Sequence, residues 1–264
     1  YPVPDLPMTR ILGIRLAQKL FDTVRPMAFA LHARPLNRVR RRYGLPPLGS
    51  DLRNVYTWGD YTLYADVPEL VPTRPLPANH RYLGPPLWSA RAPLPDWWDH
   101  LPEGNPVVLL TLGSSGRADL LPMALPTLSE LPITVIAATA GKIDLPDVPA
   151  NAFVADYLPL DVAARRASLV ICNGGSLTTY QALASGVPIL GVCSNMDQLL
   201  NMSAIARLGA GLSLRAARIR PAQLKEAVRA LLEIPAYAQA AGQAGERFRQ
   251  VDAGQRFRAF VSEV

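Results

Sequence analysis

The sequence contains few cysteines and histidines and no long apolar run. Its only cysteines, Cys172 and Cys193, exclude a disulfide-rich scaffold and a cysteine-based metal site. Each ends a predicted buried strand, where a free thiol is usually inert, and this low content favours a reducing, cytoplasmic setting. No apolar run reaches the roughly 18 residues that a membrane-spanning helix needs. No signal peptide is visible, and because the chain begins with Tyr1 we expect part of the protein to lie upstream.

Lysine is also scarce, because 24 of the 27 basic residues are arginine. The formal net charge of +6 leaves two interpretations open, attraction to anionic partners or arginines on solvated surfaces. The charge is spread along the chain rather than gathered in a tail, so we expect no nucleic-acid partner. The one dense run, Arg38–Arg42, fits a helix end whose cations favour the helix dipole. Its alternative is a peripheral contact with an anionic membrane surface.

The first part of the chain is rich in proline and irregular. Apolar residues at helical spacing predict a helix over 11–43, which Pro26 and Pro35 divide into pieces. A short strand is expected at 61–65. Residues 72–105 are aperiodic and proline-rich, which is typical of a linker, with a short helix near Trp97.

The pattern changes at residue 106, where short apolar runs begin to alternate with helix-like stretches. Strands are predicted at 107–112, 133–137, 152–155, 169–172, 189–192 and 211–214. Helices are predicted at 117–130, 160–167, 177–185, 196–208 and 221–233, with a last helical stretch at 237–260. Continuous apolar strands separated by helices predict a parallel sheet that is covered on both faces. We therefore predict an α/β fold with a doubly wound parallel sheet.

Small and polar residues follow several of these strands, where ligands bind in a doubly wound sheet. The residues Gly113-Ser114-Ser115-Gly116 follow the first strand and could approach phosphate oxygens, although such a segment alone is more often a plain turn. The sequence N-G-G-S-L-T at 173–178 follows another strand and opens a helix. Backbone donors and the helix dipole make such a turn an anion site. Its alternative is a plain turn with N-cap residues, and the two adjacent glycines favour phosphate.

Two further strand ends carry residues with more than one interpretation. Tyr157 could stack on a planar base or be an aromatic at the edge of the core. Asp197 and Gln198 open a helix, so they could either favour its dipole or bind ligand hydroxyls.

Three segments together resemble the donor-binding half of a GT-B glycosyltransferase. They are Y-L-P at 157–159, N-G-G-S-L-T-T-Y-Q-A-L-A-S-G-V-P-I-L at 173–190, and N-M-D-Q-L-L-N at 195–201. The closest resemblance is to the family of UDP-glucuronosyltransferases and bacterial macrolide and antibiotic glycosyltransferases. It implies a remnant of the acceptor domain at 1–80, a linker at 81–105, a Rossmann-like nucleotide-sugar-binding domain at 106–235, and a C-terminal helix at 236–264 that crosses back.

The resemblance also implies a role for each matching residue. Tyr157 would stack on the nucleobase, the 173–178 turn would bind the pyrophosphate, and Asp197 with Gln198 would hold the sugar hydroxyls. The implied donor-binding residues are Gly113, Ser114, Tyr157, Asn173, Gly174, Gly175, Ser176, Thr178, Gln181, Asp197 and Gln198.

Three positions depart from the family pattern. Asn173 replaces a histidine and cannot become cationic. Leu160 replaces a glutamine near the base, and Gln181 replaces a glutamate that accepts hydrogen bonds from the ribose. These changes leave the nucleotide open between uridine and thymidine.

The resemblance implies an inverting transfer of a hexose from a nucleoside-diphosphate sugar to a hydroxyl of a small-molecule or lipid acceptor. No cofactor or metal is expected, and there is no Asp-x-Asp pair. The family's catalytic base is a histidine in a region that this chain lacks, and His32, His80 and His100 do not match it. Two alternatives remain open: a donor subunit that needs an acceptor-domain partner chain, and a non-catalytic scaffold or activator.

Overall fold

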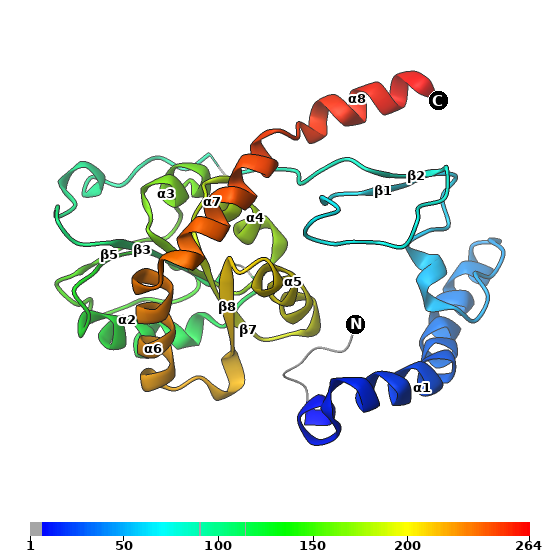
Figure 1. Cartoon of the computed structure of the whole chain (residues 1–264), viewed down its shortest axis with the longest axis horizontal. Coiled ribbons are helices and arrows are strands. Elements are labelled where there is room, and N and C mark those ends of the chain that lie inside the picture. Colours follow the sequence, from blue (N-terminus) through cyan, green and yellow to red (C-terminus); the bar gives the residue numbers. More distant parts are fainter. Residues whose placement is uncertain (1–6, 90, 114) are drawn as a thin grey trace. The chain divides into compact units, whose positions relative to one another are not determined.

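The computed structural model describes residues 7–89, 91–113 and 115–264 and divides into two units (Figure 1). The first unit comprises the chain up to Tyr64 together with Thr73–Tyr82, and the second comprises Ala65–Pro72 and Leu83–Val264. Within the described residues, no helix is both long enough and apolar enough to cross a membrane.

A long helix dominates the first unit. Helix α1 (Pro7–Arg42) covers all but the last residue of the predicted 11–43 helix, and its backbone leaves helical geometry at Gly13, where φ is 72°. Pro26 and Pro35 lie inside α1 rather than dividing it. One arginine of the run at its C-terminus packs against an aromatic ring, because the Arg40 guanidinium lies 5.0 Å from the Trp58 ring centroid.

Two short strands complete the first unit with the 3-10 helix η1 (Leu52–Val55). Strand β1 (Thr62–Tyr64) confirms the predicted strand and pairs in parallel with β2 (His80–Tyr82). The sequence did not predict β2, because three residues are too few to show a period of two. Residues 80–82 therefore belong to a sheet, whereas their composition had indicated the start of a linker.

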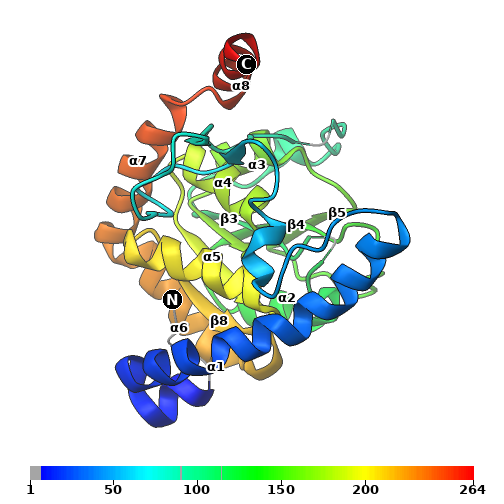
Figure 2. The same cartoon turned by 90° about the vertical axis from the view of Figure 1, so that its right-hand side faces the viewer.

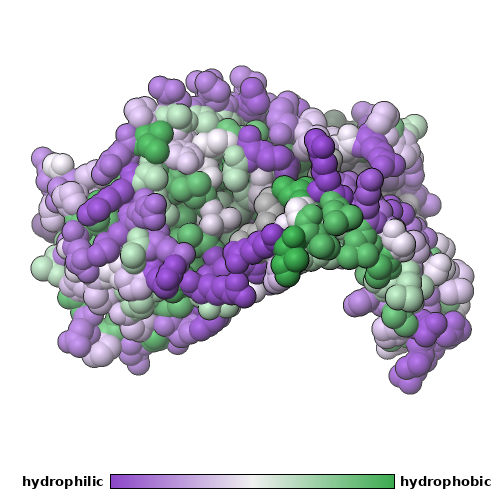
Figure 3. All heavy atoms as spheres, turned by 60° about the horizontal axis from the view of Figure 1, so that its bottom comes forward, coloured by the Kyte–Doolittle hydropathy of each residue, from purple (hydrophilic) through white to green (hydrophobic). Residues whose placement is uncertain are grey.

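Many apolar side chains of α1 are exposed, and Figure 3 shows apolar side chains gathered on part of the face of the molecule that it draws. The exposed ones of α1 are Ile11, Leu12, Ile14, Leu16, Leu20, Phe21, Val24, Met27, Leu31 and Val39. An exposed apolar face of this kind is characteristic of a surface that contacts another molecule or domain.

The second unit contains a six-stranded parallel sheet, which confirms the predicted doubly wound α/β fold. Its strands are β3 (Val107–Thr111), β4 (Thr134–Ala138), β5 (Ala152–Ala155), β6 (Leu169–Cys172), β7 (Ile189–Cys193) and β8 (Gly211–Arg215). Their order is β5-β4-β3-β6-β7-β8. The chain thus builds outward from β3 in one direction and from β6 in the other, and ligands bind where this order reverses.

Helices connect these strands and cover both faces of the sheet. They are α2 (Leu121–Ser129), α3 (Leu160–Arg166), α4 (Ser176–Ala184), α5 (Met196–Arg207) and α6 (Pro221–Glu233), with the 3-10 helices η2 (Trp98–His100), η3 (Ala118–Leu120) and η4 (Ala216–Arg218). Helices α2 and α6 cover one face, and α3, α4 and α5 lie together on the other (Figure 2).

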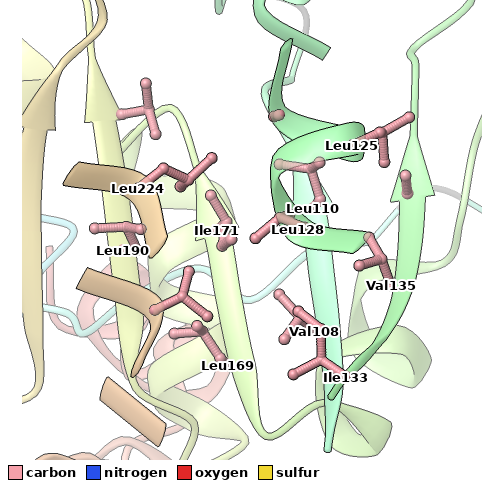
Figure 4. Packing of buried hydrophobic residues seen from close by; sticks show 14 of the residues in the cluster. Val108, Leu110, Leu125, Leu128, Ile133, Val135, Leu169, Ile171, Leu190 and Leu224 are labelled. Carbon is pink, nitrogen blue, oxygen red and sulfur yellow. The ribbon is translucent and has the colours of Figure 1, made fainter. Parts of the chain in front are cut away.

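The core forms because alternate strand residues point to opposite faces of the sheet. Val108 and Leu110 of β3 point to the same side as Leu125 of α2 and Leu224 of α6, where all four are buried (Figure 4). The neighbouring Leu109 is buried on the other face. Two-sided burial explains why these strands appear in the sequence as continuous apolar runs.

The C-terminal helical stretch is two helices rather than one. Helix α7 (Pro235–Arg249) ends before a short break, and α8 (Ala253–Glu263) then begins. The Asp252 carboxylate caps α8 by accepting a hydrogen bond from the Gln255 N–H at 2.8 Å. An aspartate that precedes a new helical turn is a typical N-cap, and it explains why the continuous helix expected at 237–260 is divided.

The segment Ala65–Pro72 precedes the predicted linker, yet it packs with the second unit. Val67 and Leu70 are buried, and the Tyr180 hydroxyl of α4 donates a hydrogen bond to the Asp66 carboxylate. The Tyr180 ring in turn packs edge-on against Phe248 of α7, with centroids 5.6 Å apart. The sequence had assigned this segment to the N-terminal remnant, because its apolar residues are too few to indicate which core they join.

Burial of Asp66 leads to a testable pH dependence. Desolvation raises the pKa of this carboxyl above its ordinary value of 3.8, although the bond from Tyr180 opposes the shift. The native state therefore holds this proton more tightly than the unfolded chain, so the resulting stability is present below pH 3.8 and is lost as the pH rises through the native pKa. We expect the melting temperature of the wild type, minus that of Asp66→Asn, to be larger at pH 4 than at pH 7. A difference that does not change with pH would contradict this.

Candidate functional site

A pocket of about 450 Å³ lies beyond the carboxyl ends of β3 and β6, at the reversal of strand order. Seven of the predicted residues line it: Gly113, Tyr157, Asn173, Gly175, Ser176, Thr178 and Asp197. Gly174, Gln181 and Gln198 lie elsewhere, and Ser114 lies outside the described residues. The pocket is therefore at the position that the topology predicts for a ligand.

The 173–178 turn presents backbone donors to this pocket. Gly174 has a φ of 83°, a conformation that glycine adopts without strain. The first backbone bond of α4 runs from the Thr179 N–H to the Gly175 carbonyl at 3.2 Å. The N–H groups of Ser176, Leu177 and Thr178 precede it, and within the described chain no acceptor bonds them. Three free donors at the positive end of a helix dipole are suited to binding an anion.

Asn173 connects this turn with the loop after β3. Its Oδ1 accepts a hydrogen bond from the Gly175 N–H at 3.0 Å, and its Nδ2 donates to Ser115 Oγ at 3.0 Å. The side chain is only 5% exposed. Asn173 therefore braces the two loops against each other, a role that the sequence did not indicate, and it occupies the Gly175 N–H that we expected to face a phosphate.

Tyr157 stands at the opposite end of the pocket with its side chain 58% exposed. Its hydroxyl donates a hydrogen bond to the Ala140 carbonyl at 3.0 Å. The backbone there is held in turn, since Thr139 Oγ1 donates to the Asp156 carboxylate at 2.9 Å. The tyrosine ring is thus tethered at its tip and leaves a face on which a planar group can stack.

Asp197 and Gln198 lie next to each other but differ in their surroundings. Asp197 lines the pocket from the first turn of α5 and is exposed. Gln198 is 2% exposed, and its Oε1 accepts hydrogen bonds from Ser194, at 2.8 Å from the backbone N and 3.0 Å from Oγ. Gln198 therefore holds the turn between β7 and α5, and its expected contact with a sugar stays a prediction.

Gln181 opens onto a separate groove of about 940 Å³. Its side chain is 6% exposed and lies on α4. The groove also contains Arg91, Arg165 and Arg249, and it meets the pocket at Ser89, which lines both. A ligand that extends past Ser89 would reach Gln181.

Several lining residues were not predicted. Trp88 and Ser89 come from the linker, where proline-rich and aperiodic sequence gives no signal of where the chain will pass. Trp88 is 62% exposed, so a second aromatic face borders the pocket. Asp156 and Ser115 were visible at strand ends, and their position there was the only signal that could have identified them.

The linker is fixed to the second unit just beyond these residues. The Trp97 indole N–H donates to the Val154 carbonyl of β5 at 3.2 Å. Arg166 of α3 donates to the Trp98 carbonyl at 2.7 Å and lies 5.1 Å from the centroid of the Trp98 ring. These contacts fix the part of the linker that follows Trp88 to β5 and α3.

The three histidines contact residues that do not line the pocket. Nδ1 of His32 lies 2.8 Å from the Ala28 carbonyl, and Nδ1 of His100 lies 3.1 Å from the Asp96 carbonyl. His80 is bonded to the Tyr64 hydroxyl at 2.9 Å. Of the residues that the structure describes, none that lines the pocket is a histidine. The described parts of the chain also contain no group of three or more His, Cys, Asp or Glu side chains arranged to hold a metal ion.

Comparison with protein families matches residues 123–250 to the erythromycin biosynthesis protein CIII-like C-terminal domain. This range contains the 173–178 turn, Tyr157 and Asp197.

Curated relatives are similar over most of this chain. A PGL/p-HBAD biosynthesis rhamnosyltransferase of Mycobacterium bovis (strain BCG / Pasteur 1173P2) is 54% identical over 94% of this chain and 55% of the relative. A PGL/p-HBAD biosynthesis glycosyltransferase of Mycobacterium tuberculosis (strain ATCC 25177 / H37Ra) is 55% identical over 94% of this chain and 58% of the relative. The chain thus spans somewhat more than half the length of these relatives.

Solved structures share the fold. The spinosyn forosaminyltransferase SpnP superposes with a TM-score of 0.70 at 22% identity, over 88% of this chain and 60% of that one. The spinosyn rhamnosyltransferase SpnG, solved with thymidine diphosphate, gives a TM-score of 0.67 at 23% identity, over 85% and 60%. Residues 123–250 therefore match the erythromycin biosynthesis protein CIII-like C-terminal domain family, and the chain is a homologue of glycosyltransferases that shares the GT-B fold.

Proposed function

We propose that this chain is the donor-binding part of an inverting, metal-independent glycosyltransferase. An acceptor hydroxyl attacks the anomeric carbon of a nucleoside-diphosphate sugar while the bond from that carbon to the diphosphate oxygen breaks. The bonding electrons leave with the nucleoside diphosphate, and a base takes the acceptor proton. The observation that carries this proposal is the set of three unbonded N–H groups of Ser176, Leu177 and Thr178 at the reversal of strand order.

These donors suit the leaving group. Negative charge accumulates on the diphosphate as the glycosidic bond breaks, and fixed N–H groups at a helix N-terminus stabilise such charge without reorganising. The turn can therefore supply the electrostatic stabilisation that a divalent cation provides in other transferases.

The pocket can hold the two ends of such a donor. The base would stack on the Tyr157 ring, with Trp88 bordering the same space, and Asp197 would accept hydrogen bonds from the sugar. Between them, the ribose would lie near Ser89, where the pocket meets the groove that contains Gln181.

We propose thymidine as the nucleoside and rhamnose as the sugar. Gln181 is neutral, so it gains less than a carboxylate would from the second hydroxyl of a ribose, and this favours the 2′-deoxyribose of thymidine. The rhamnosyltransferase relative at 54% identity supports the sugar, and the fold shared with a thymidine diphosphate complex agrees with the nucleotide.

The acceptor would be a small molecule or a lipid. Its binding site and the catalytic base would be provided by an acceptor-side part of the protein or by a partner chain. Two observations support this. No histidine is among the described residues that line the pocket, and the exposed apolar face of α1 is suited to being covered by such a part.

Calorimetric titration of the 264-residue chain tests the proposal. We expect saturable binding of thymidine-diphosphate rhamnose and of thymidine diphosphate, weaker binding of uridine diphosphate, and the weakest binding of thymidine, which lacks phosphates. If neither thymidine-diphosphate rhamnose nor thymidine diphosphate bound at millimolar concentration, the donor-binding function would be refuted and the non-catalytic scaffold would be supported instead.

A further inference from the structure

Asn201 bonds the 173–178 turn from the neighbouring helix. It lies on α5, and its Nδ2 donates a hydrogen bond to the Gly174 carbonyl at 2.8 Å. The same nitrogen donates to Thr179 Oγ1 at 2.9 Å. An amide nitrogen carries two hydrogens, so one side chain satisfies both acceptors.

Thr179 extends this contact to the next peptide groups. Its side chain is fully buried, and its hydroxyl donates toward the carbonyls of Gly175 and Ser176, each at 3.1 Å. Asn201 therefore orients the Gly174 carbonyl directly. Through the Thr179 hydroxyl it also orients the next two carbonyls, those of Gly175 and Ser176. The orientation of these peptides sets the direction of the N–H groups at the start of α4, because each peptide unit is planar.

Close packing reinforces the same contact. A Cβ added to Gly174 would lie 2.8 Å from Met202 Cγ and 2.9 Å from Cys193 Sγ. Only a glycine lets the turn approach α5 this closely. The turn and α5 therefore meet as one packed unit, with Asn201 as the polar contact between them.

Asn201 bonds the turn and lies on the same helix as Asp197. The two residues are four positions apart on α5, so they share a face of the helix. We propose that Asn201 is a positioning residue that sets the 173–178 turn relative to Asp197, so that a diphosphate and the sugar attached to it are bound together. This inference rests on the proposed donor-binding function and goes beyond it, because Asn201 does not line the pocket.

The test compares two isosteric substitutions in the 264-residue chain. Asn201→Asp removes both donated bonds and places a carboxylate beside the Gly174 carbonyl. Asn151→Asp is the matched control, because Asn151 Nδ2 donates to the carbonyls of Ile133 and Leu128 at 3.0 and 3.5 Å and does not line the pocket. Calorimetry with thymidine diphosphate should show at least a tenfold loss of affinity for Asn201→Asp and less than a twofold change for Asn151→Asp.

A double-mutant cycle separates positioning from general destabilisation. With thymidine-diphosphate rhamnose, the loss caused by Asn201→Asp should be at least threefold smaller in an Asp197→Ala background than in the wild type. If Asn201→Asp does not fold, Asn201→Ser, which keeps one neutral donor, takes its place with an expected loss of at least threefold. Two results would overturn the inference about Asn201: equal losses of affinity in both backgrounds, or an unchanged affinity of the Asn201 variant for thymidine diphosphate. In either case, binding by the wild type would still support the proposed function. Absence of wild-type binding would refute the proposed function itself.

Discussion

We expect Gly175→Asp to weaken the binding of thymidine diphosphate by at least about 100-fold, or about 2.7 kcal/mol. Gly175 is the residue that precedes α4, and it lines the pocket beside the free N–H groups. A carboxylate there would face the bound diphosphate at close range. Two unit charges about 4 Å apart repel by about 4 kcal/mol at an effective dielectric constant of about 20. Isothermal titration calorimetry measures the loss directly.

Charge and bulk are separated by a second substitution at the same position. A Cβ at Gly175 would lie 3.2 Å from Asn173 Oδ1, so any side chain causes some crowding. Gly175→Asn has the same shape as Gly175→Asp without its charge, and it should retain at least a tenth of the wild-type affinity. Equal affinities of the Asp and Asn variants would show that the diphosphate does not bind at this turn.

The second large effect is expected from Tyr157→Ala. Stacking of a base on an aromatic ring contributes about 1–3 kcal/mol, so the affinity for thymidine diphosphate should fall by roughly fivefold to 150-fold. The ring is more than half exposed and is tethered through its hydroxyl rather than buried. Its loss should therefore leave the melting temperature nearly unchanged, and this distinguishes a binding role from a structural one.

Tyr157→Phe provides the matched control. It keeps the ring and removes only the bond to the Ala140 carbonyl. We expect its affinity to stay within about threefold of the wild type, since an exposed hydrogen bond contributes about 1 kcal/mol or less. If removing the hydroxyl cost as much as removing the ring, stacking on Tyr157 would be the wrong explanation. If neither substitution changed affinity, the base would lie elsewhere.

The fold of the second unit was largely predictable because its strands are buried on both faces. Strands such as Val107–Thr111 and Leu169–Cys172 appear as continuous apolar runs, and two of the six have the bounds that the sequence predicted. The short β2 was not predictable, since three residues at the edge of a small sheet have no period of their own. The division between α7 and α8 depends on one capping side chain, Asp252.

Prediction of the site was accurate where a residue's place in the sheet decides its position. Tyr157 and the 173–178 turn line one pocket because both directly follow parallel strands. The prediction of the site was incomplete where side-chain contacts decide whether a residue faces the pocket. Asn173 braces two loops, and Gln198 bonds Ser194, although both stand at positions that resemble ligand contacts. Trp88 reaches the pocket from an aperiodic linker, which only the tertiary structure could reveal.

The N–H groups at the start of α4 are expected to bind the diphosphate of a sugar nucleotide. Titrating thymidine diphosphate into the ¹⁵N-labelled chain and following its amide resonances tests this most directly. The amide signals of Ser176, Leu177 and Thr178 should shift most and saturate together with the calorimetric isotherm. In Gly175→Asp these shifts should disappear. Saturable binding that leaves these three amides unperturbed would contradict this expectation, because the diphosphate would then be held by another part of the molecule.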